Sequence, residues 1–72
     1  MNIILYKSDT CPQCRVLKMK LDKKGIRYTE EKDIRVMTER GIHSIPQLEV
    51  DGVLYPSVKA ASDWINAQEV QN

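Results

Sequence analysis

The feature that most constrains this chain is a pair of cysteines, Cys11 and Cys14, that follows a short apolar run and the polar stretch Lys7–Thr10. The run Asn2–Tyr6 is apolar and β-branched, so it predicts a short buried strand. Pro12 suits the first position of a helix, where its missing N–H costs nothing, and Gly25 is a typical helix stop. We therefore expect a helix that begins at Pro12, is capped by Cys11 or by the residue before it, and ends before Gly25.

Strand and helix signals alternate along the rest of the chain. They are a strand at Ile26–Thr29, a helix at Asp33–Arg40 closed by Gly41, a hairpin of Pro46–Val50 and Val53–Tyr55 around Asp51-Gly52, and a last helix capped by Ser57. A helix between the first two strands makes them parallel. The predicted order is β-α-β-α-β-β-α, an α/β fold whose four-stranded mixed sheet carries helices on its faces. At 72 residues the chain forms a single domain, residues 1–72.

The apolar residues of these helices recur at helical spacing, which predicts that they face the sheet. They are Cys14, Leu17 and Leu21 with Val16 and Met19 in the first helix, Ile34 and Met37 in the second, and Val58, Ala61, Trp64 and Ile65 in the third. Because this spacing is the common signature of a core, Trp64 is expected to be a core residue rather than a stacking platform.

The spacing of the cysteine pair suits redox chemistry. Three residues along a helix rise about 4.5 Å and return to nearly the same face, so the sulfurs of Cys11 and Cys14 can meet in a disulfide. Cys11 stands at the helix start, where free backbone N–H groups and the positive end of the helix dipole stabilise a thiolate and lower its pKa. We therefore expect Cys11 to attack a partner disulfide, and Cys14, which is more buried, to resolve the mixed disulfide.

Metal binding and a structural role are the other interpretations of the pair. A zinc site needs four ligands, and His43 is the only further His or Cys, so zinc held within one chain is disfavoured. A buried structural pair is disfavoured because a helix start after a polar loop is normally exposed. His43 is expected to be a solvent-facing loop residue.

Composition and charge narrow the class of partner. The longest apolar run, Ile3–Tyr6, is too short to span a bilayer and starts too early for a signal peptide, so we expect no membrane association and a cytoplasmic location. The formal net charge is +1, but residues 1–27 carry seven cations and two anions, a distribution that can steer an acidic partner. Nucleic acid is disfavoured, since the pI is near neutral and no aromatic residue is interleaved with the basic run.

Three motifs together resemble the glutaredoxin branch of the thioredoxin-like fold. They are Cys11-Pro12-Gln13-Cys14 after the first strand, Ser44-Ile45-Pro46-Gln47 before the third, and Asp51-Gly52 at the hairpin. Within that branch, the Cys-x-Gln-Cys pattern, Lys18 and the stretch Gly41–Pro46 look most like the NrdH-redoxins, small electron donors to ribonucleotide reductase. Pro12 looks instead like ordinary glutaredoxins.

The resemblance implies a set of site residues around the catalytic pair Cys11 and Cys14. Pro46 is expected to be cis and to lie against Cys11, while the Ile45 backbone pairs with the backbone of the substrate. For Lys18, one turn beyond Cys14, helix position leaves two interpretations, a charge that helps the helix dipole lower the thiolate pKa and an ordinary solvated helix face. The residues expected to contact the substrate are Pro12, Gln13, Ser44, Ile45, Pro46, Tyr6 and Lys7, with the core as the alternative place for Tyr6.

Departures from the glutaredoxin pattern bear on the reductant. Glutaredoxins carry a Gly-Gly pair after the hairpin and then an acidic residue that holds the amino end of glutathione, whereas this chain has Pro56-Ser57 and then Val58-Lys59. Proline offers no backbone donor, and lysine repels an ammonium group. We therefore expect re-reduction by thioredoxin reductase and NADPH rather than by glutathione, and no bound cofactor. The resemblance implies ribonucleotide reductase as the protein partner, and a carrier that docks on more than one protein is expected to be a monomer.

A binding module is the alternative function. It would be a non-catalytic thioredoxin-like domain, or a dimer that shares a metal or iron–sulfur centre through Cys11 of each chain. Pro12 and the presence of Cys14 disfavour the cluster version in this family. Turnover of disulfides distinguishes the carrier from the module.

Overall fold

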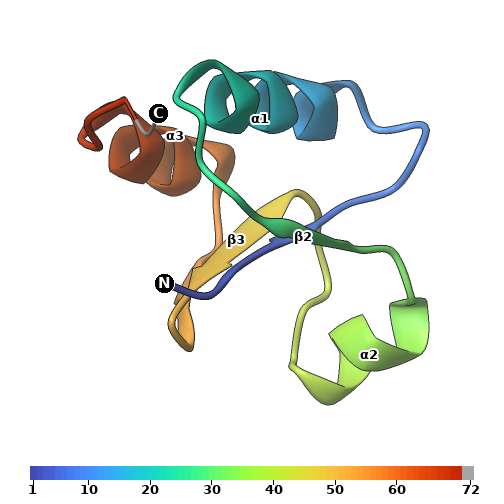
Figure 1. Cartoon of the computed structure of the whole chain (residues 1–72). Helices are drawn as coiled ribbons and strands as arrows, with labels where there is room; N and C mark the ends of the chain where they lie inside the picture. Colours follow the sequence, from blue (N-terminus) through green and yellow to red (C-terminus); the bar gives the residue numbers. More distant parts are fainter. Residues whose placement is uncertain (71–72) are drawn as a thin grey trace.

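A computed structural model describes residues 1–70, and its elements follow one another in the predicted order (Figure 1). They are β1 Ile3–Tyr6, α1 Pro12–Lys23, β2 Thr29–Glu31, α2 Ile34–Glu39, β3 Gln47–Val50, β4 Val53–Tyr55 and α3 Val58–Asn66. Within residues 1–70, four strands form one mixed sheet that three helices cover, which confirms the predicted α/β, thioredoxin-like architecture. Among these same residues, no helix has both the length and the apolar character that crossing a membrane requires.

The sheet has the strand order β2-β1-β3-β4. β1 pairs in parallel with β2 and in antiparallel fashion with β3, which in turn pairs antiparallel with β4. Leu5 in the central strand is in register with Glu30 on one side and Leu48 on the other. The β3–β4 turn places Asp51 at φ 49° and Gly52 at φ 87°, the two left-handed residues that a two-residue hairpin requires, so the predicted hairpin is confirmed.

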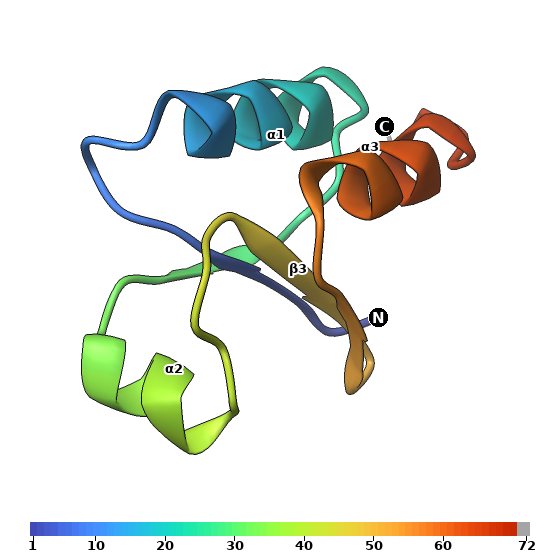
Figure 2. The same ribbon diagram turned by 180° about the vertical axis from the view of Figure 1, so that it is seen from behind.

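The helices cover both faces of the sheet. α1 and α3 lie on one face and α2 lies on the other (Figure 1, Figure 2). The main core lies under α1 and α3, where Leu5 and Leu48 of the sheet join Leu17 and Ile65 of the helices. A smaller cluster lies under α2 and consists of Tyr6, Met37 and Ile42.

The second strand begins at Thr29 rather than at the start of the predicted strand, Ile26–Thr29. The cause is the way in which α1 ends. Gly25 adopts φ 70°, and the N–H of Ile26 donates to the carbonyl oxygen of Leu21 at 3.0 Å, which closes the helix in a Schellman turn. Ile26 belongs to the same core cluster as Leu21. The prediction was therefore wrong for the residues before Thr29, because Ile26 is used to close the helix.

α2 ends in the same kind of turn. Gly41 adopts φ 75°, and the N–H of Ile42 donates to the carbonyl oxygen of Met37 at 2.8 Å. Asp33 caps the helix as predicted, with its carboxylate accepting a backbone N–H of the first turn at 2.8 Å. The predicted burial of Met37 is confirmed, but that of Ile34 was wrong, since Ile34 is 76% exposed. A two-turn helix presents one narrow face to the sheet, and the turn brings Ile42 rather than Ile34 to Met37.

The buried face of α1 is narrower than predicted. Cys14, Leu17 and Leu21 are fully buried, as expected. The predicted burial of Val16 and Met19 was wrong, because these side chains are 46% and 69% exposed. With 3.6 residues per turn, Met19 is rotated about 200° from Leu17 and must point away from the sheet.

α3 follows its predicted pattern. Ser57 caps the helix by accepting a backbone N–H of the first turn at 3.0 Å. Ala61 and Ile65 are fully buried. Trp64 is partly buried and packs against the main core, with its ring centroid 6.1 Å from that of Tyr55, so its predicted core position is confirmed.

The two faces of α1 give a direct test of the packing. Leu17→Ala should lower the free energy of unfolding by about 2–5 kcal/mol, because it removes a buried side chain and leaves a cavity. Met19→Ala, two residues along the same helix, should change that free energy by less than about 0.5 kcal/mol. Urea unfolding followed by circular dichroism measures both. Equal losses in the two variants would contradict the assignment of the faces.

Candidate redox site

The two cysteines meet at the start of α1. Cys11 is the N-cap of the helix, and its sulfur accepts a hydrogen bond from the backbone N–H of Cys14 at 3.1 Å. The Cα atoms of the pair are 5.2 Å apart, and the two sulfurs are joined in a disulfide. Cys14 is fully buried, whereas Cys11 is partly exposed. An incoming group therefore reaches Cys11 first, with Cys14 directly behind it.

The sequence builds this geometry locally. Cys11 is extended, with φ −93° and ψ 110°, and Pro12 starts the helix immediately after it. A cap normally uses a Ser, Thr, Asp or Asn oxygen to satisfy a free N–H of the first turn, and here a sulfur takes that place. When the disulfide is reduced, a thiolate at this position lies at the positive end of the α1 dipole. The arrangement can therefore favour a reactive thiolate on the exposed member of the pair.

A second loop reaches the same end of the sheet. Tyr6, the last residue of β1, is in register with Gln47, the first residue of β3, so the loops that carry Cys11 and Pro46 leave from neighbouring strands. The Ile45–Pro46 bond is cis, as the family resemblance implied.

The predicted contact residues of these two loops differ in exposure. Pro46 is buried, Ile45 is partly exposed and Ser44 is exposed. The hydroxyl of Ser44 accepts a hydrogen bond from the Gln47 side chain at 3.4 Å. Pro12 and Gln13 are exposed beside Cys11 at the start of α1. All except Pro46 thus present surface to an incoming chain.

Tyr6 lies in the core instead of at the substrate. It is 1% exposed and packs with Met37 and Ile42 under α2. Its hydroxyl donates to the Glu49 carboxylate at 3.0 Å, and burial raises the pKa of the Tyr6 phenol. Of the two places expected for Tyr6, the structure shows the core, and the side chain offers almost no surface to a substrate.

Lys7 and Lys18 share one carboxylate on β2. Their ammonium groups lie 3.4 Å and 3.1 Å from Glu30 Oε1, and Lys18 is the main cause that lowers the pKa of Glu30. The Lys7 side chain is only 11% exposed, so its predicted contact with a substrate is not supported by its position. Lys18 carries the charge that thiolate tuning requires, but part of that charge is offset by Glu30. Its predicted effect on Cys11 stays a prediction.

Sequence reasoning missed a buried ionic cluster under α2. Glu49 is 6% exposed and accepts hydrogen bonds from the Tyr6 hydroxyl and from the guanidinium of Arg40. A buried carboxylate is costly unless it is paired and hydrogen-bonded, so these two donors account for its presence in the sheet. The available signal was a charged residue between Leu48 and Val50 in an otherwise apolar strand.

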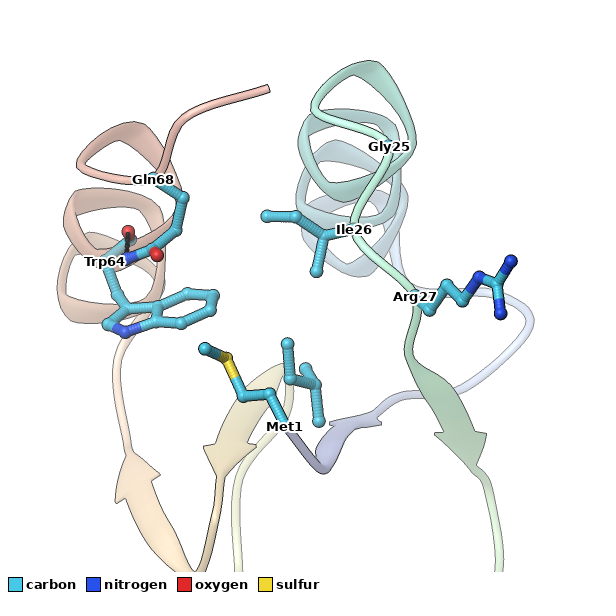
Figure 3. Close-up of a pocket in the computed structure, with 7 residues that line it drawn as sticks. Met1, Gly25, Ile26, Arg27, Trp64 and Gln68 are labelled. Carbon is cyan, nitrogen blue, oxygen red and sulfur yellow. Dashed lines mark hydrogen bonds between the residues drawn. The ribbon is translucent and has the colours of Figure 1, made fainter. Parts of the chain in front are cut away.

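Other features lie away from the cysteines. A pocket of about 450 Å³ is found at the opposite end of β1, where Ile3, Ile26 and Trp64 line it together with Met1 (Figure 3). Within residues 1–70, no group of three or more His, Cys, Asp and Glu side chains is arranged to hold a metal ion.

The geometry of this site agrees with a comparison of the sequence with known families. The sequence model of the family named Glutaredoxin matches residues 3–55, a range that includes both cysteines, Pro46 and the hairpin. The chain belongs to the glutaredoxin family. No curated protein matches it. Thiol–disulfide oxidoreduction is the general activity of glutaredoxins, and Cys11 and Cys14 of this chain lie close together, as in a Cys-x-x-Cys motif.

Removal of one hydroxyl tests the place given to Tyr6. Tyr6→Phe should lower the free energy of unfolding by about 1–3 kcal/mol, because it takes a donor from the buried Glu49 carboxylate. Tyr28→Phe is the matched control, since the Tyr28 hydroxyl donates to Asp22 at the exposed surface, and it should cost less than about 0.5 kcal/mol. Thermal unfolding and reduction of a small disulfide are measured on both. If Tyr6→Phe reduces the small disulfide more slowly without any loss of stability, the core position of Tyr6 is contradicted and a contact with the substrate is favoured.

Proposed function

We propose that this glutaredoxin is a dithiol electron carrier that reduces disulfides of a protein partner. The observation that carries the proposal is the pairing of a partly exposed Cys11 sulfur at the helix start with a buried Cys14, at a Cα separation of 5.2 Å. Nucleophile and resolving group need different exposure, because the first must meet the partner and the second must wait behind it. A reducing compartment such as the cytoplasm, and a monomer that can dock on more than one protein, suit this role.

The reaction balances with the two cysteines alone. The Cys11 thiolate attacks one sulfur of the partner disulfide, which forms a mixed disulfide and expels the other sulfur as a thiolate. Cys14 loses its proton and attacks Cys11, which breaks the mixed disulfide and releases the second partner thiolate. Two electrons pass to the partner, and the Cys11–Cys14 disulfide remains. Two electrons from a reductase then restore the dithiol.

The loops beside Cys11 offer a surface for the partner chain. Pro12 and Gln13 are exposed on one side, and Ser44 and Ile45 precede the cis Pro46 on the other. An extended partner segment that lies across this surface would place its disulfide next to Cys11. Because the Cys-x-Gln-Cys pattern, Lys18 and the stretch Gly41–Pro46 resemble the NrdH-redoxins, we name ribonucleotide reductase as the partner.

The region after β4 favours thioredoxin reductase over glutathione as the source of electrons. Pro56 has no N–H to offer a bound peptide, and the Ser57 hydroxyl is engaged as the cap of α3. Lys59 repels the ammonium group of glutathione. The Lys59 ammonium lies 2.8 Å from the carboxylate of Asp63, the acidic residue of α3, so this carboxylate is paired with a lysine and does not offer the glutathione ammonium a free partner.

Serine substitution separates the roles of the two cysteines. Cys11→Ser should abolish turnover of a protein disulfide and still fold, because serine is a good N-cap. Cys14→Ser should react once and stop at the mixed disulfide, because the resolving thiol is missing. Mass spectrometry of the protein after incubation with a disulfide peptide identifies the adduct. Full dithiol turnover by Cys11→Ser would contradict the mechanism.

Two coupled assays test the reductant. NADPH oxidation with a small disulfide should proceed when thioredoxin reductase is supplied, and should stay at background when glutathione and glutathione reductase are supplied. Lys59→Glu is the matched variant, since it restores an acidic residue and should raise any glutathione-dependent rate. Activity of the unchanged protein with glutathione alone would overturn the argument from Pro56 and Lys59. Failure of both systems would favour the non-catalytic binding module.

A further inference from the structure

We propose that the outer face of α1 is a docking groove for an acidic, amphipathic segment of the protein partner. The inference rests on the proposed function, in that the partner is the protein whose disulfide is reduced. We call this surface the α1 groove. Its floor and rim include Val16, Met19 and Val70, together with Lys20, Lys23 and Lys24.

The α1 groove exposes apolar side chains that the core does not use. Met19 is 69% exposed, Val70 57% and Val16 46%, and all three line one hollow of about 770 Å³. Single exposed apolar residues need no explanation, but a group of them in one hollow marks an interaction surface. Helical spacing predicted Val16 and Met19 for the core, and the structure places them outside both core clusters of residues 1–70.

Cations surround this apolar floor. Lys20 and Lys23 have no ion pair with any acidic side chain that the structure describes. Lys24 donates to the backbone carbonyl of Gln68 at 2.7 Å, which leaves its charge uncompensated by any described carboxylate. Asp22, the one acidic residue of α1, also lines the groove, where three lysines outnumber its single carboxylate, and it accepts a hydrogen bond from the Tyr28 hydroxyl. The groove therefore presents positive charge around apolar side chains, which complements an acidic segment with apolar anchors.

The α1 groove and the redox site lie on the same helix. Val16 follows Pro12 by one helical turn, and Lys23 lies about 18 Å along the helix from Cys11 at 1.5 Å per residue. Five or six extended residues, at about 3.3 Å each, cover that distance. A partner segment held in the groove would keep a disulfide on the same chain close to Cys11, and would raise its effective concentration without taking part in the chemistry.

Charge and shape favour a protein segment over other occupants. A second copy of this chain would bring lysines against lysines. A lipid surface needs a broad apolar helix face that enters the bilayer. The buried side of α1 packs on the sheet, and its outer side exposes only two large apolar side chains, Val16 and Met19. A nucleic acid strand needs aromatic side chains for stacking, and none lines the groove within residues 1–70. A groove this small gives a transient complex, as suits a carrier.

The test uses two synthetic peptides that carry the same disulfide. One continues into a glutamate-rich segment with leucines at i and i+4, and the other has lysines in place of the glutamates. We expect the acidic peptide to have a KM about tenfold lower at equal kcat. In the double variant Lys20→Glu with Lys23→Glu, the KM for the acidic peptide should rise about tenfold, while the reduction of hydroxyethyl disulfide stays unchanged.

Matched variants separate the groove from net charge. Arg27→Glu with Arg35→Glu makes the same charge change at exposed positions outside the groove, and should shift the KM less than about twofold. Met19→Glu should weaken the acidic peptide, and Ile34→Glu, which changes an exposed apolar residue on α2, should not. Equal KM values for the two peptides, or equal effects of the two double variants, would overturn the proposal.

A binding measurement keeps the inference independent of turnover. Fluorescence anisotropy of a labelled acidic peptide without cysteine should report binding that salt weakens and that Met19→Glu abolishes. Such binding without any turnover of hydroxyethyl disulfide would defeat the proposed function and leave the groove standing. Turnover of hydroxyethyl disulfide without any binding of the peptide would overturn the groove and leave the proposed function standing. Binding to phosphatidylserine vesicles, or a dimer that Met19→Glu dissolves, with no peptide binding, would also overturn the proposal.

Discussion

The hydrogen bond from the Cys14 N–H to the Cys11 sulfur is the interaction on which the site depends. It makes a sulfur the cap of α1, so the start of the helix and the reactive group are one structure. Leu17 and Leu21 pack the helix on the sheet, and the loop after β1 places Cys11 at the end of the sheet where β3 begins. A thiolate at this position satisfies free N–H groups of the helix as well as meeting the partner. Folding and reactivity therefore draw on the same contact.

Most of the fold could be predicted because its signals are local. The helix start at Pro12, the hairpin around Asp51-Gly52 and the cap at Ser57 need only their own neighbours, and each is confirmed. The predictions for Ile26 and Ile34 were wrong because the positions of these residues depend on how the turns at Gly25 and Gly41 redirect the chain. The spacing of apolar residues contains no information about those turns. Contacts between distant segments explain the burial of Tyr6 and Glu49, whereas Val16 and Met19 lie on the face of α1 that helix geometry turns away from the sheet.

The site was predictable to a similar depth. The cysteine pair and the cis bond before Pro46 follow from motifs, and the family match agrees with them. The burial of Tyr6 against Glu49 and Arg40 could not be predicted, because it joins β1 to residues more than thirty positions further along the chain. The lysines also fall into two groups, and their ion pairs could not be predicted from the sequence. Those near Cys11 share Glu30, while those on the outer face of α1 lack a described acidic partner.

The most direct test of the account is the pH dependence of Cys11 alkylation. Reduced protein is reacted with iodoacetamide at a series of pH values, and the modified Cys11 peptide is quantified by mass spectrometry, with urea-unfolded protein as the control. The account predicts that the Cys11 rate reaches half of its maximum well below pH 8.5, the ordinary value for a free thiol, and that unfolding abolishes this difference. A half-maximal rate at the same pH in folded and unfolded protein would contradict the claim that the start of α1 activates Cys11.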